Sequence, residues 1–287
     1  MTDEPDRPVL CELQDRALIR VSGADARAFL QGQLSNDVRE VTPAQSQLTS
    51  LNTPQGRTLA LMRLFELQDT LMLSLPRDLQ MPIIERLRKY ILRSRVELEP
   101  ADDFAGCGIA GESAATALGE AGIAPPVAVD EAGANDDVIA IRVPSQAGNR
   151  FELYGKDRPL AAVRDALSAQ CERAEPETWR LLDTLAEIPL LSPATSGEFV
   201  AQMLNLDELG AINFKKGCYA GQEIIARTHY RGQVKRRLKL LFRSEPAQPG
   251  ESLDLDENIS AVVVQSALHP QRGFAVLAVA PSNAEPR

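Results

Sequence analysis

The order in which strand-like and helical segments follow one another sets the fold class of this chain. Three segments typical of strands, separated by turn residues, lie at 47–51, 58–67 and 70–75 and predict an antiparallel meander. Apolar residues at helical spacing predict a helix on either side of it, over 26–34 and 82–91. Strands and helices in this mixed order favour α+β layers over a doubly wound parallel sheet.

The remaining segments extend this pattern and then change it. A single strand is expected over 10–21, and the stretch 189–217 is mostly loop with one helical piece at 204–209. Beyond Gly232, short apolar or alternating segments between turn residues predict a small all-β module. These segments are 237–242, 260–265 and 273–280.

The composition argues against several classes of function. A net charge of −9 and an aromatic content of 5% do not suit a chain whose whole surface binds nucleic acid. Neither a G-x-G-x-x-G sequence after a strand nor a Walker A sequence occurs. No apolar stretch approaches the roughly 20 residues of a membrane span, and the acidic residues 1–8 differ from a secretory signal. We therefore expect a cytoplasmic monomer with no membrane contact.

Four cysteines are spread singly along the chain. Without a C-x-x-C pair, their spacing fits neither a disulfide framework nor a zinc or cluster site, so we expect no resident metal. Cys11, Cys107 and Cys171 lie beside apolar residues, which is typical of small buried side chains. Cys218 differs from them because its flanking residues are charged, polar and rich in glycine.

Cys218 follows Lys215, Lys216 and Gly217 and precedes a segment, 219–227, that we expect to form a short helix. A thiol just before a helix N-terminus faces the positive end of the helix dipole, and the two lysines add positive charge. Both effects favour the thiolate and predict a nucleophilic sulfur. The alternative is a free cysteine that is merely buried, and residue chemistry alone leaves both interpretations open.

Basic residues are concentrated around this cysteine. Between Asn213 and Lys239, eight lysines and arginines stand against one acid, Glu223, which leaves a local charge of +7 in a chain of −9. A solvated loop is one interpretation, and a site for a ligand with carboxylates or phosphates is another. A tRNA-binding surface is a third, although Tyr219 and Tyr230 are the main aromatic residues available to stack on bases.

The two histidines give weak support to a hydrolase or a metal site. His229 lies eleven residues after Cys218, near or beyond the end of the expected helix, so a Cys-His pair is a weak candidate. Cys218 and His229 alone would leave a metal ion incompletely coordinated.

A longer motif surrounds the cysteine. Residues 216–223, Lys-Gly-Cys-Tyr-Ala-Gly-Gln-Glu, resemble the K-G-C-[FY]-x-G-Q-E signature of the YgfZ family. That family is related to the folate-dependent aminomethyltransferase of the glycine cleavage system. Other segments that resemble the family are 23–38, 52–57, 202–207, 210–215 and 226–232.

The resemblance implies an α+β fold with three domains in a ring-like arrangement and a small, barrel-like all-β domain at the C-terminus. The domains would be 1–48 with 174–232, which carries the cysteine, then 49–173 and 233–287. The implied function is a tetrahydrofolate-binding accessory protein for iron-sulfur cluster assembly or repair. Its partners would be a folate derivative, iron-sulfur proteins or cluster-assembly factors, and tRNA-modifying enzymes such as the tRNA methylthiotransferase.

The resemblance also assigns site residues. Cys218 would be the redox-active or transiently ligating thiol. Lys216, Arg227 and Arg231 would face the anionic glutamate tail of a folate, and Glu223 would orient a neighbouring base or contact the ligand. The amides in the site would hydrogen-bond a pterin or cap a loop. The residues expected to bind the cofactor are Gln202, Asn205, Lys216, Tyr219, Gln222, Glu223, Arg227 and Arg231.

Two departures from the related aminomethyltransferases bear on the reaction. Residues 56–61 contain no carboxylate where those enzymes carry a catalytic acid, so aminomethyl transfer is not expected and the enzymatic status stays open. Leu185 stands where an acid that grips the pterin is expected, and Asp183 or Glu187 is available to replace it. The alternative functions are a folate-dependent one-carbon transferase and a tRNA-modification partner.

Overall fold

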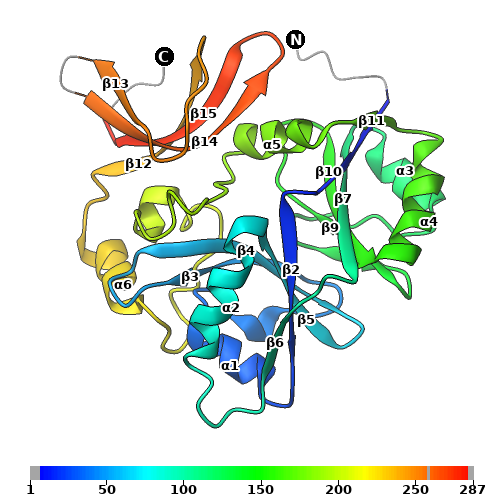
Figure 1. The fold of residues 1–287 in the computed structure, drawn as a ribbon, viewed down its shortest axis with the longest axis horizontal. Coiled ribbons are helices and arrows are strands. Elements are labelled where there is room, and N and C mark those ends of the chain that lie inside the picture. The colour runs from blue at the N-terminus through cyan, green and yellow to red at the C-terminus, as the bar shows by residue number, and fades with distance from the viewer. Residues whose placement is uncertain (1–6, 257–258, 284–287) are drawn as a thin grey trace.

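Three β-sheets organise the part of the chain that the structure describes (Figure 1). The computed structural model describes residues 7–256 and 259–283. The five-stranded sheet, in the order β3-β4-β5-β2-β6, consists of β2 (Arg16–Ser22), β3 (Gln47–Asn52), β4 (Thr58–Leu67), β5 (Thr70–Pro76) and β6 (Glu97–Pro100). The six-stranded sheet, in the order β11-β1-β7-β10-β9-β8, consists of β1 (Val9–Glu12), β7 (Phe104–Gly111), β8 (Ala132–Ala134), β9 (Val138–Arg142), β10 (Asn149–Lys156) and β11 (Glu172–Ala174). The four-stranded sheet, in the order β12-β15-β14-β13, consists of β12 (Arg236–Arg243), β13 (Ser252–Asp256), β14 (Ile259–His269) and β15 (Gly273–Pro281).

Helices cover the outer faces of the first two sheets. The helices and 3₁₀ turns are α1 (Ala26–Gln33), η1 (Val38–Glu40), η2 (Arg77–Leu79), α2 (Gln80–Arg88), α3 (Ala114–Glu120), α4 (Asp157–Ser168), α5 (Pro176–Leu185), η3 (Ala201–Leu204) and α6 (Gln222–Arg231). Apolar residues of α1 and α2 pack on the five-stranded sheet, and those of α3 and α4 pack on the six-stranded sheet. No helix in the described part of the chain has the length and apolar character needed to cross a membrane.

The five-stranded and six-stranded sheets pack face to face. Their inner faces share a core that includes Leu18 and Phe65 from one sheet and Ile139 and Tyr154 from the other, closed by Trp179 of α5. The layers therefore run helix, sheet, sheet, helix, and the predicted α+β class is confirmed.

The predicted meander is confirmed as β3, β4 and β5, because turn residues bound each strand closely. The strand expected over 10–21 is instead two strands in different sheets. β1 pairs with β7 and β11, whereas β2 pairs with β5 and β6. The turn at residues 13–15 carries the chain from the six-stranded sheet into the five-stranded sheet.

Strand pairing groups the chain into sheets, which are a different division from the domains expected above. The expected limit at residue 48 lies inside β3, which pairs with β4 in the same sheet as β2. The five-stranded sheet spans residues 16–100, and the six-stranded sheet combines 9–12 with 104–174. Sheet membership depends on pairing between distant segments, which local sequence patterns do not report.

The all-β C-terminal module is confirmed as an antiparallel sheet with one additional strand, β13. One face of this sheet carries its own core. The other face joins the large core of the five-stranded sheet through residues such as Leu238, Val264 and Leu277. The segment between α5 and α6 contributes to that shared core, and the motif around Cys218 lies near its end.

Candidate functional site

The cysteine loop lies ahead of α6 in irregular backbone. The helix expected over 219–227 begins only at Gln222, and its N-cap is Gly221 with φ 82°. Cys218 therefore lies four residues before the first helical residue. Because the helix dipole acts mainly within the first turn, its effect on this sulfur is weaker than the sequence predicts.

Lys216 anchors the loop on one side of the cysteine. Its side chain is 5% exposed, and Nζ donates hydrogen bonds to the carbonyls of Gln31 (2.7 Å), Leu34 (2.6 Å) and Asn36 (2.9 Å). These carbonyls lie at and just beyond the C-terminus of α1, where backbone acceptors lack helical partners and favour a cation. Burial lowers the pKa of Lys216 to about 8. An ammonium group has three N–H donors, and all three are used here.

Tyr219 anchors the loop on the other side. Its side chain is 7% exposed within the large core, and its ring lies 5.2 Å from Nζ of Lys216. Burial raises the pKa of its phenol to about 12. Cys218 is exposed between these two buried side chains. The loop therefore fixes the backbone on both sides of a thiol that faces solvent.

Gly221 closes the loop against a distant turn. A Cβ at this position would lie 2.5 Å from the carbonyl oxygen of Thr53 and 2.9 Å from Cα of Gly56. Both glycines have positive φ, and a Cβ on Gly56 would meet Ile224 of α6 at 3.1 Å. The second glycine of the motif thus permits close backbone contact between the cysteine loop and the turn 53–57.

The other three cysteines behave as the sequence predicts. Cys11, Cys107 and Cys171 are buried, and burial raises their pKa values to about 12, about 12 and about 11. Raised pKa values keep these thiols protonated and unreactive at neutral pH. Cys218 is the exposed member of the four.

The amides assigned to the site have different roles. Asn205, in the left-handed conformation after η3, donates to the carbonyl of Leu238 (3.1 Å) and accepts from Arg237 (3.2 Å), so it joins η3 to β12. Gln202 is buried and donates to the carbonyl of Ile225 (2.6 Å), but its Oε1 has no hydrogen-bond partner in the described chain. A buried acceptor without a partner is unusual and is suited to a ligand N–H group.

The remaining assigned residues lie on or beside α6. Gln222 is half-buried and donates to the carbonyl of Lys216 at 3.4 Å, which braces the loop. Glu223, Arg227 and Arg231 are exposed. Within the described residues no ion pair joins Glu223 to Lys216 or Arg227, so the expected orienting role of Glu223 has no contact to support it.

Asp183 and Glu187, the two acids considered for the pterin, differ in burial and in the partners of their side chains. Asp183 is 1% exposed and forms ion pairs with Arg16 (2.6 Å) and Arg150, so its carboxylate joins α5 to the two facing sheets. Glu187 is half-buried at φ 55°, and its side chain has no ion pair or hydrogen bond to the described residues. Burial and the nearby Glu208 raise its pKa. Glu187 is therefore the acid that remains available.

Phe214 and His229 form a cluster that the sequence analysis did not identify. The ring of His229 stacks on Phe214 with centroids 3.8 Å apart and an angle of 14° between the planes. Tyr230 contacts both rings edge-on. His229 makes no hydrogen bond to Cys218 in the described chain, so the structure does not support the Cys-His pair. A stack between residues fifteen positions apart has no local sequence signal.

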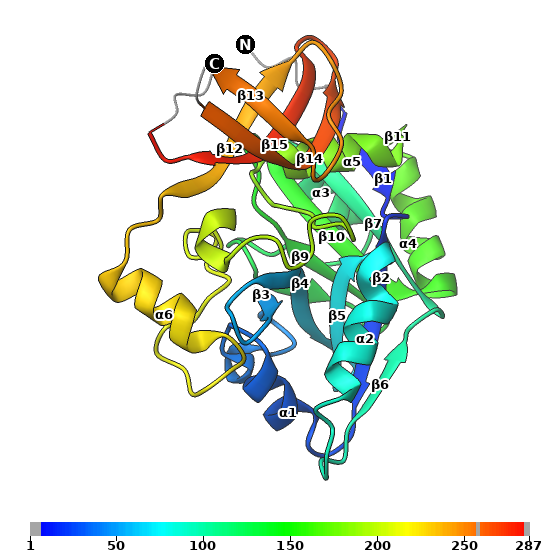
Figure 2. The same ribbon diagram turned by 60° about the vertical axis from the view of Figure 1, so that its left-hand side comes forward.

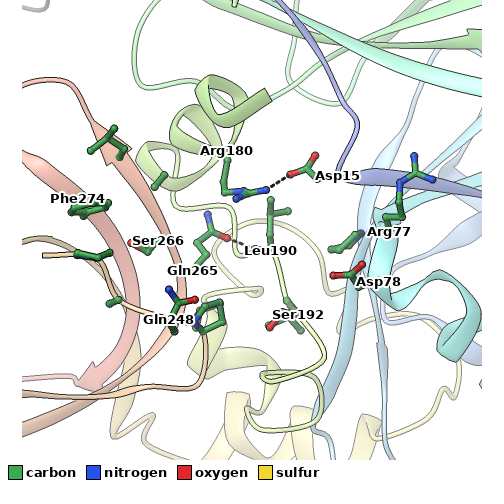
Figure 3. Close-up of a pocket in the computed structure, with 18 of the residues that line it drawn as sticks. Asp15, Arg77, Asp78, Arg180, Leu190, Ser192, Gln248, Gln265, Ser266 and Phe274 are labelled. Atoms are coloured by element: carbon green, nitrogen blue, oxygen red, sulfur yellow. Dashed lines mark hydrogen bonds and ion pairs between the residues drawn. The ribbon is translucent and has the colours of Figure 1, made fainter. Parts of the chain in front are cut away.

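A pocket of about 520 Å³ lies between α5, the five-stranded sheet and the C-terminal sheet (Figure 3). Asp15 and Arg180, an ion pair at 3.5 Å, line one side, and Gln248 and Ser266 line the side of the C-terminal sheet. Gln265 is turned to the backbone N–H of Leu190 and to Thr184, so it fastens the sheets rather than facing a ligand. None of the residues assigned to the site lines this pocket.

No group of three or more His, Cys, Asp and Glu side chains in residues 7–256 and 259–283 is arranged to hold a metal ion. The groups that the described residues leave available are the thiol of Cys218, the carboxylates of Glu187 and Glu223, Oε1 of Gln202 and the exposed cations of α6.

Comparison with known proteins identifies relatives in sequence and in fold. No protein-family model matches the chain. The chain is 34% identical over 248 residues to the tRNA-modifying protein YgfZ of Klebsiella pneumoniae, which covers 86% of this chain and 76% of that protein. It is 33% identical to the tRNA-modifying protein YgfZ of Escherichia coli O157:H7 with the same coverage. Its fold is similar to that of the glycine cleavage system aminomethyltransferase T from Bartonella henselae, with a TM-score of 0.75 at 18% identity over 96% of this chain and 78% of the other.

Proposed function

The chain belongs to the YgfZ family, and we propose that it is a tetrahydrofolate-binding accessory protein for the assembly or repair of iron-sulfur clusters. The observation that carries this proposal is the exposed thiol of Cys218 between the buried anchors Lys216 and Tyr219. A loop built in this way offers one sulfur atom to a second molecule while its own backbone stays fixed.

The proposed chemistry of Cys218 is limited by the number of ligands it can supply. A thiolate provides one ligand, whereas iron-sulfur clusters are commonly held by four. A cluster that contacts Cys218 would therefore be cargo whose other ligands belong to a client protein or a cluster-assembly factor. The alternative is a mixed disulfide, in which the thiolate attacks a disulfide of the partner and one partner sulfur leaves as a thiol.

Two groups in the chain fit the pterin ring of a folate. The unpaired carboxylate of Glu187 would accept the amino and ring N–H groups, as a carboxylate does in a paired hydrogen bond. Oε1 of Gln202, which lacks a partner, would accept a further N–H group. Arg227 and Arg231 would bind the anionic glutamate tail. Bound tetrahydrofolate would supply a carrier of one-carbon units.

A role in tRNA modification is the second candidate, and the relatives that share the family are named for that process. It is compatible with the first, since a cluster-dependent tRNA-modifying enzyme would be one client. A folate-dependent one-carbon transferase has less support, because residues 56–61 offer no carboxylate and are used for packing. Gly56 contacts α6, and Ala60 is fully buried.

The central test compares Cys218→Ser with Cys171→Ala in cells that lack the native protein. The activity of a cluster-dependent tRNA-modifying enzyme is measured under oxidative stress, and tetrahydrofolate binding to each purified variant is measured by calorimetry. We expect Cys218→Ser to lose support of the enzyme while folate binding stays intact, and Cys171→Ala to retain both. Wild-type support by Cys218→Ser would refute the role of the thiol, and failure of the wild-type protein to bind folate would refute the cofactor.

A further inference from the structure

We propose that the outer face of α6, together with Lys215 and Lys235, binds a single-stranded segment or loop of RNA. The inference rests on the tRNA-linked part of the proposed function and names the surface that would contact the RNA. α6 lies at one edge of the molecule in both ribbon views, beyond the five-stranded sheet (Figures 1 and 2). That position leaves one side of the helix open to a large partner.

The cations of this face are available, unlike their neighbours in sequence. Lys216 is bound to three carbonyls, and Arg237 pairs with Asp207 and Glu208. By contrast, the side chains of four exposed bases form no ion pair or hydrogen bond with the described residues. They are Lys215, Arg227, Arg231 and Lys235. Glu223, at the start of α6, is the one acid within the helix. The face is therefore an unneutralised basic patch on a chain of net charge −9.

Helical spacing gathers the central residues of the patch. Arg227 and Arg231 are four residues apart and so are neighbours on one side of α6, and Tyr230 is three residues after Arg227. The side chain of Tyr230 is large and apolar but 65% exposed. Helical spacing therefore places an exposed aromatic ring beside the guanidinium group of Arg227.

The aromatic cluster holds this ring in place. His229 lies flat on Phe214, and Tyr230 meets His229 edge-on with centroids 4.8 Å apart and an angle of 78°. Tyr230 also meets Phe214 edge-on at 6.3 Å. Contact with two fixed rings restricts the tyrosine while most of its surface stays exposed. The same stack joins α6 to the loop that carries Cys218, only four residues after Phe214.

Exposed rings beside unpaired cations match single-stranded nucleic acid. Such proteins combine a basic surface that follows the phosphates with aromatic side chains on which bases stack. An acidic protein partner would account for the cations but not for the presentation of Tyr230 and His229. The observations therefore favour RNA, and an acidic protein becomes an outcome of the test.

The test measures binding of a fluorescent 12-nucleotide RNA of mixed sequence by anisotropy, without folate, over a range of KCl concentrations. The variants are Tyr230→Ala and the pair Lys215→Ala with Lys235→Ala, which have no assigned role in folate binding. The matched controls are Tyr90→Ala and the pair Lys89→Ala with Arg93→Ala, exposed residues just after the end of α2. Circular dichroism confirms that each variant is folded.

We expect Tyr230→Ala to weaken binding about tenfold, because a stacked base is lost. Loss of the two lysines should reduce the slope of log K against log[salt] by about 1.4, since each phosphate contact on a single strand contributes about 0.7. Both controls should bind like the wild type. No RNA binding by the wild type, or equal losses in the controls, would overturn the inference.

An acidic peptide serves as the competitor that separates the two kinds of partner. If polyglutamate of similar charge displaces the RNA and binds with equal affinity, and Tyr230→Ala affects neither ligand, the face binds acidic protein and the RNA inference fails. Because RNA binding is measured without folate and with Cys218 intact, its absence leaves the cluster and folate proposals standing. Loss of folate binding alone would likewise leave the RNA face intact.

Discussion

The cysteine loop and the end of α5 each contain a pair of like charges, and in each the fold buries one member and leaves the other available. In the loop, Lys216 is bound to three carbonyls, while Lys215 is exposed. At the end of α5, Asp183 is bound to two arginines, while Glu187 has no partner in the described chain. One member of each pair builds the scaffold, and the other is left for a ligand or partner.

Charge near a candidate site is therefore not equivalent to charge that is available to a ligand. The segment 213–239 contains eight bases, but the structure uses several of them internally. Burial and hydrogen-bond partners decide which charges remain, because an ion held by the protein has little left to offer a ligand. Substituting the buried member and the available member of each pair separately tests whether their roles differ in this way.

The largest effect is expected for Asp183→Asn. The change leaves the buried guanidinium groups of Arg16 and Arg150 without their shared carboxylate, which should lower the free energy of unfolding by about 3–5 kcal/mol. Urea denaturation followed by circular dichroism measures it. The control is Asp15→Asn. Because the Asp15–Arg180 pair is partly exposed, this change should lower the free energy of unfolding by less than about 1 kcal/mol. Equal losses in the two variants would show that Asp183 is not the anchor inferred here.

The second largest effect is expected for Lys216→Met. The free energy of unfolding at neutral pH should fall by roughly 3 kcal/mol, because three hydrogen bonds from a charged group disappear. Lys215→Met is the control and should be nearly neutral. The folded pKa of Lys216, about 8, lies below its ordinary value of 10.5, so between these values the unfolded chain binds more protons. Wild-type stability should therefore rise with pH across this window relative to Lys216→Met. Denaturation curves from about pH 7 to 10 with no such divergence would contradict this role of Lys216.

The glycines of the motif form a second matched pair. Gly221→Ala should lower the free energy of unfolding by about 2 kcal/mol, because the φ of Gly221 is positive and the added Cβ would meet the carbonyl of Thr53. Gly217 has no atom within 4 Å of an added Cβ, so Gly217→Ala should change stability by less than about 1 kcal/mol. Thermal unfolding measures both. A neutral Gly221→Ala would show that the loop does not need its close contact with the turn 53–57.

Glu187→Gln should have the smallest effect on stability and a selective effect on the ligand. Its raised pKa means that the folded state favours the protonated acid, so this group's contribution to stability falls as pH rises above its ordinary value of 4.5. Glutamine does not titrate and so removes this loss of stability. The free energy of unfolding of the variant should therefore match or slightly exceed that of the wild type at neutral pH. Tetrahydrofolate binding should weaken about tenfold, because a charge-assisted hydrogen bond is lost.

Calorimetry on Glu187→Gln and on the exposed control Glu198→Gln checks the assignment. Unchanged folate affinity in Glu187→Gln would remove Glu187 from the proposed pterin site. Weakened affinity in both variants would indicate a general effect of charge rather than a specific contact.

Local patterns predicted much of the fold and less of the site. The strands β3, β4 and β5 could be predicted because alternation and turn residues are encoded within a few positions. The late start of α6 could not, because Gly221 is held in a left-handed conformation by a turn more than 160 residues earlier. The burial of Lys216 depends on carbonyls 180 to 185 residues away. The exposure of Cys218 relative to the other cysteines was predictable from its neighbours alone.

The attachment of Lys216 to the end of α1 has a consequence for the order in which the protein becomes competent. The first third of the chain provides the acceptors, and the donor arrives only after more than two hundred residues have been synthesised. Contacts of such long sequence separation form late, because closing the intervening chain costs entropy. A growing or partly unfolded chain therefore lacks the rigid loop, and Cys218 is held between two buried anchors only in molecules that have completed their fold.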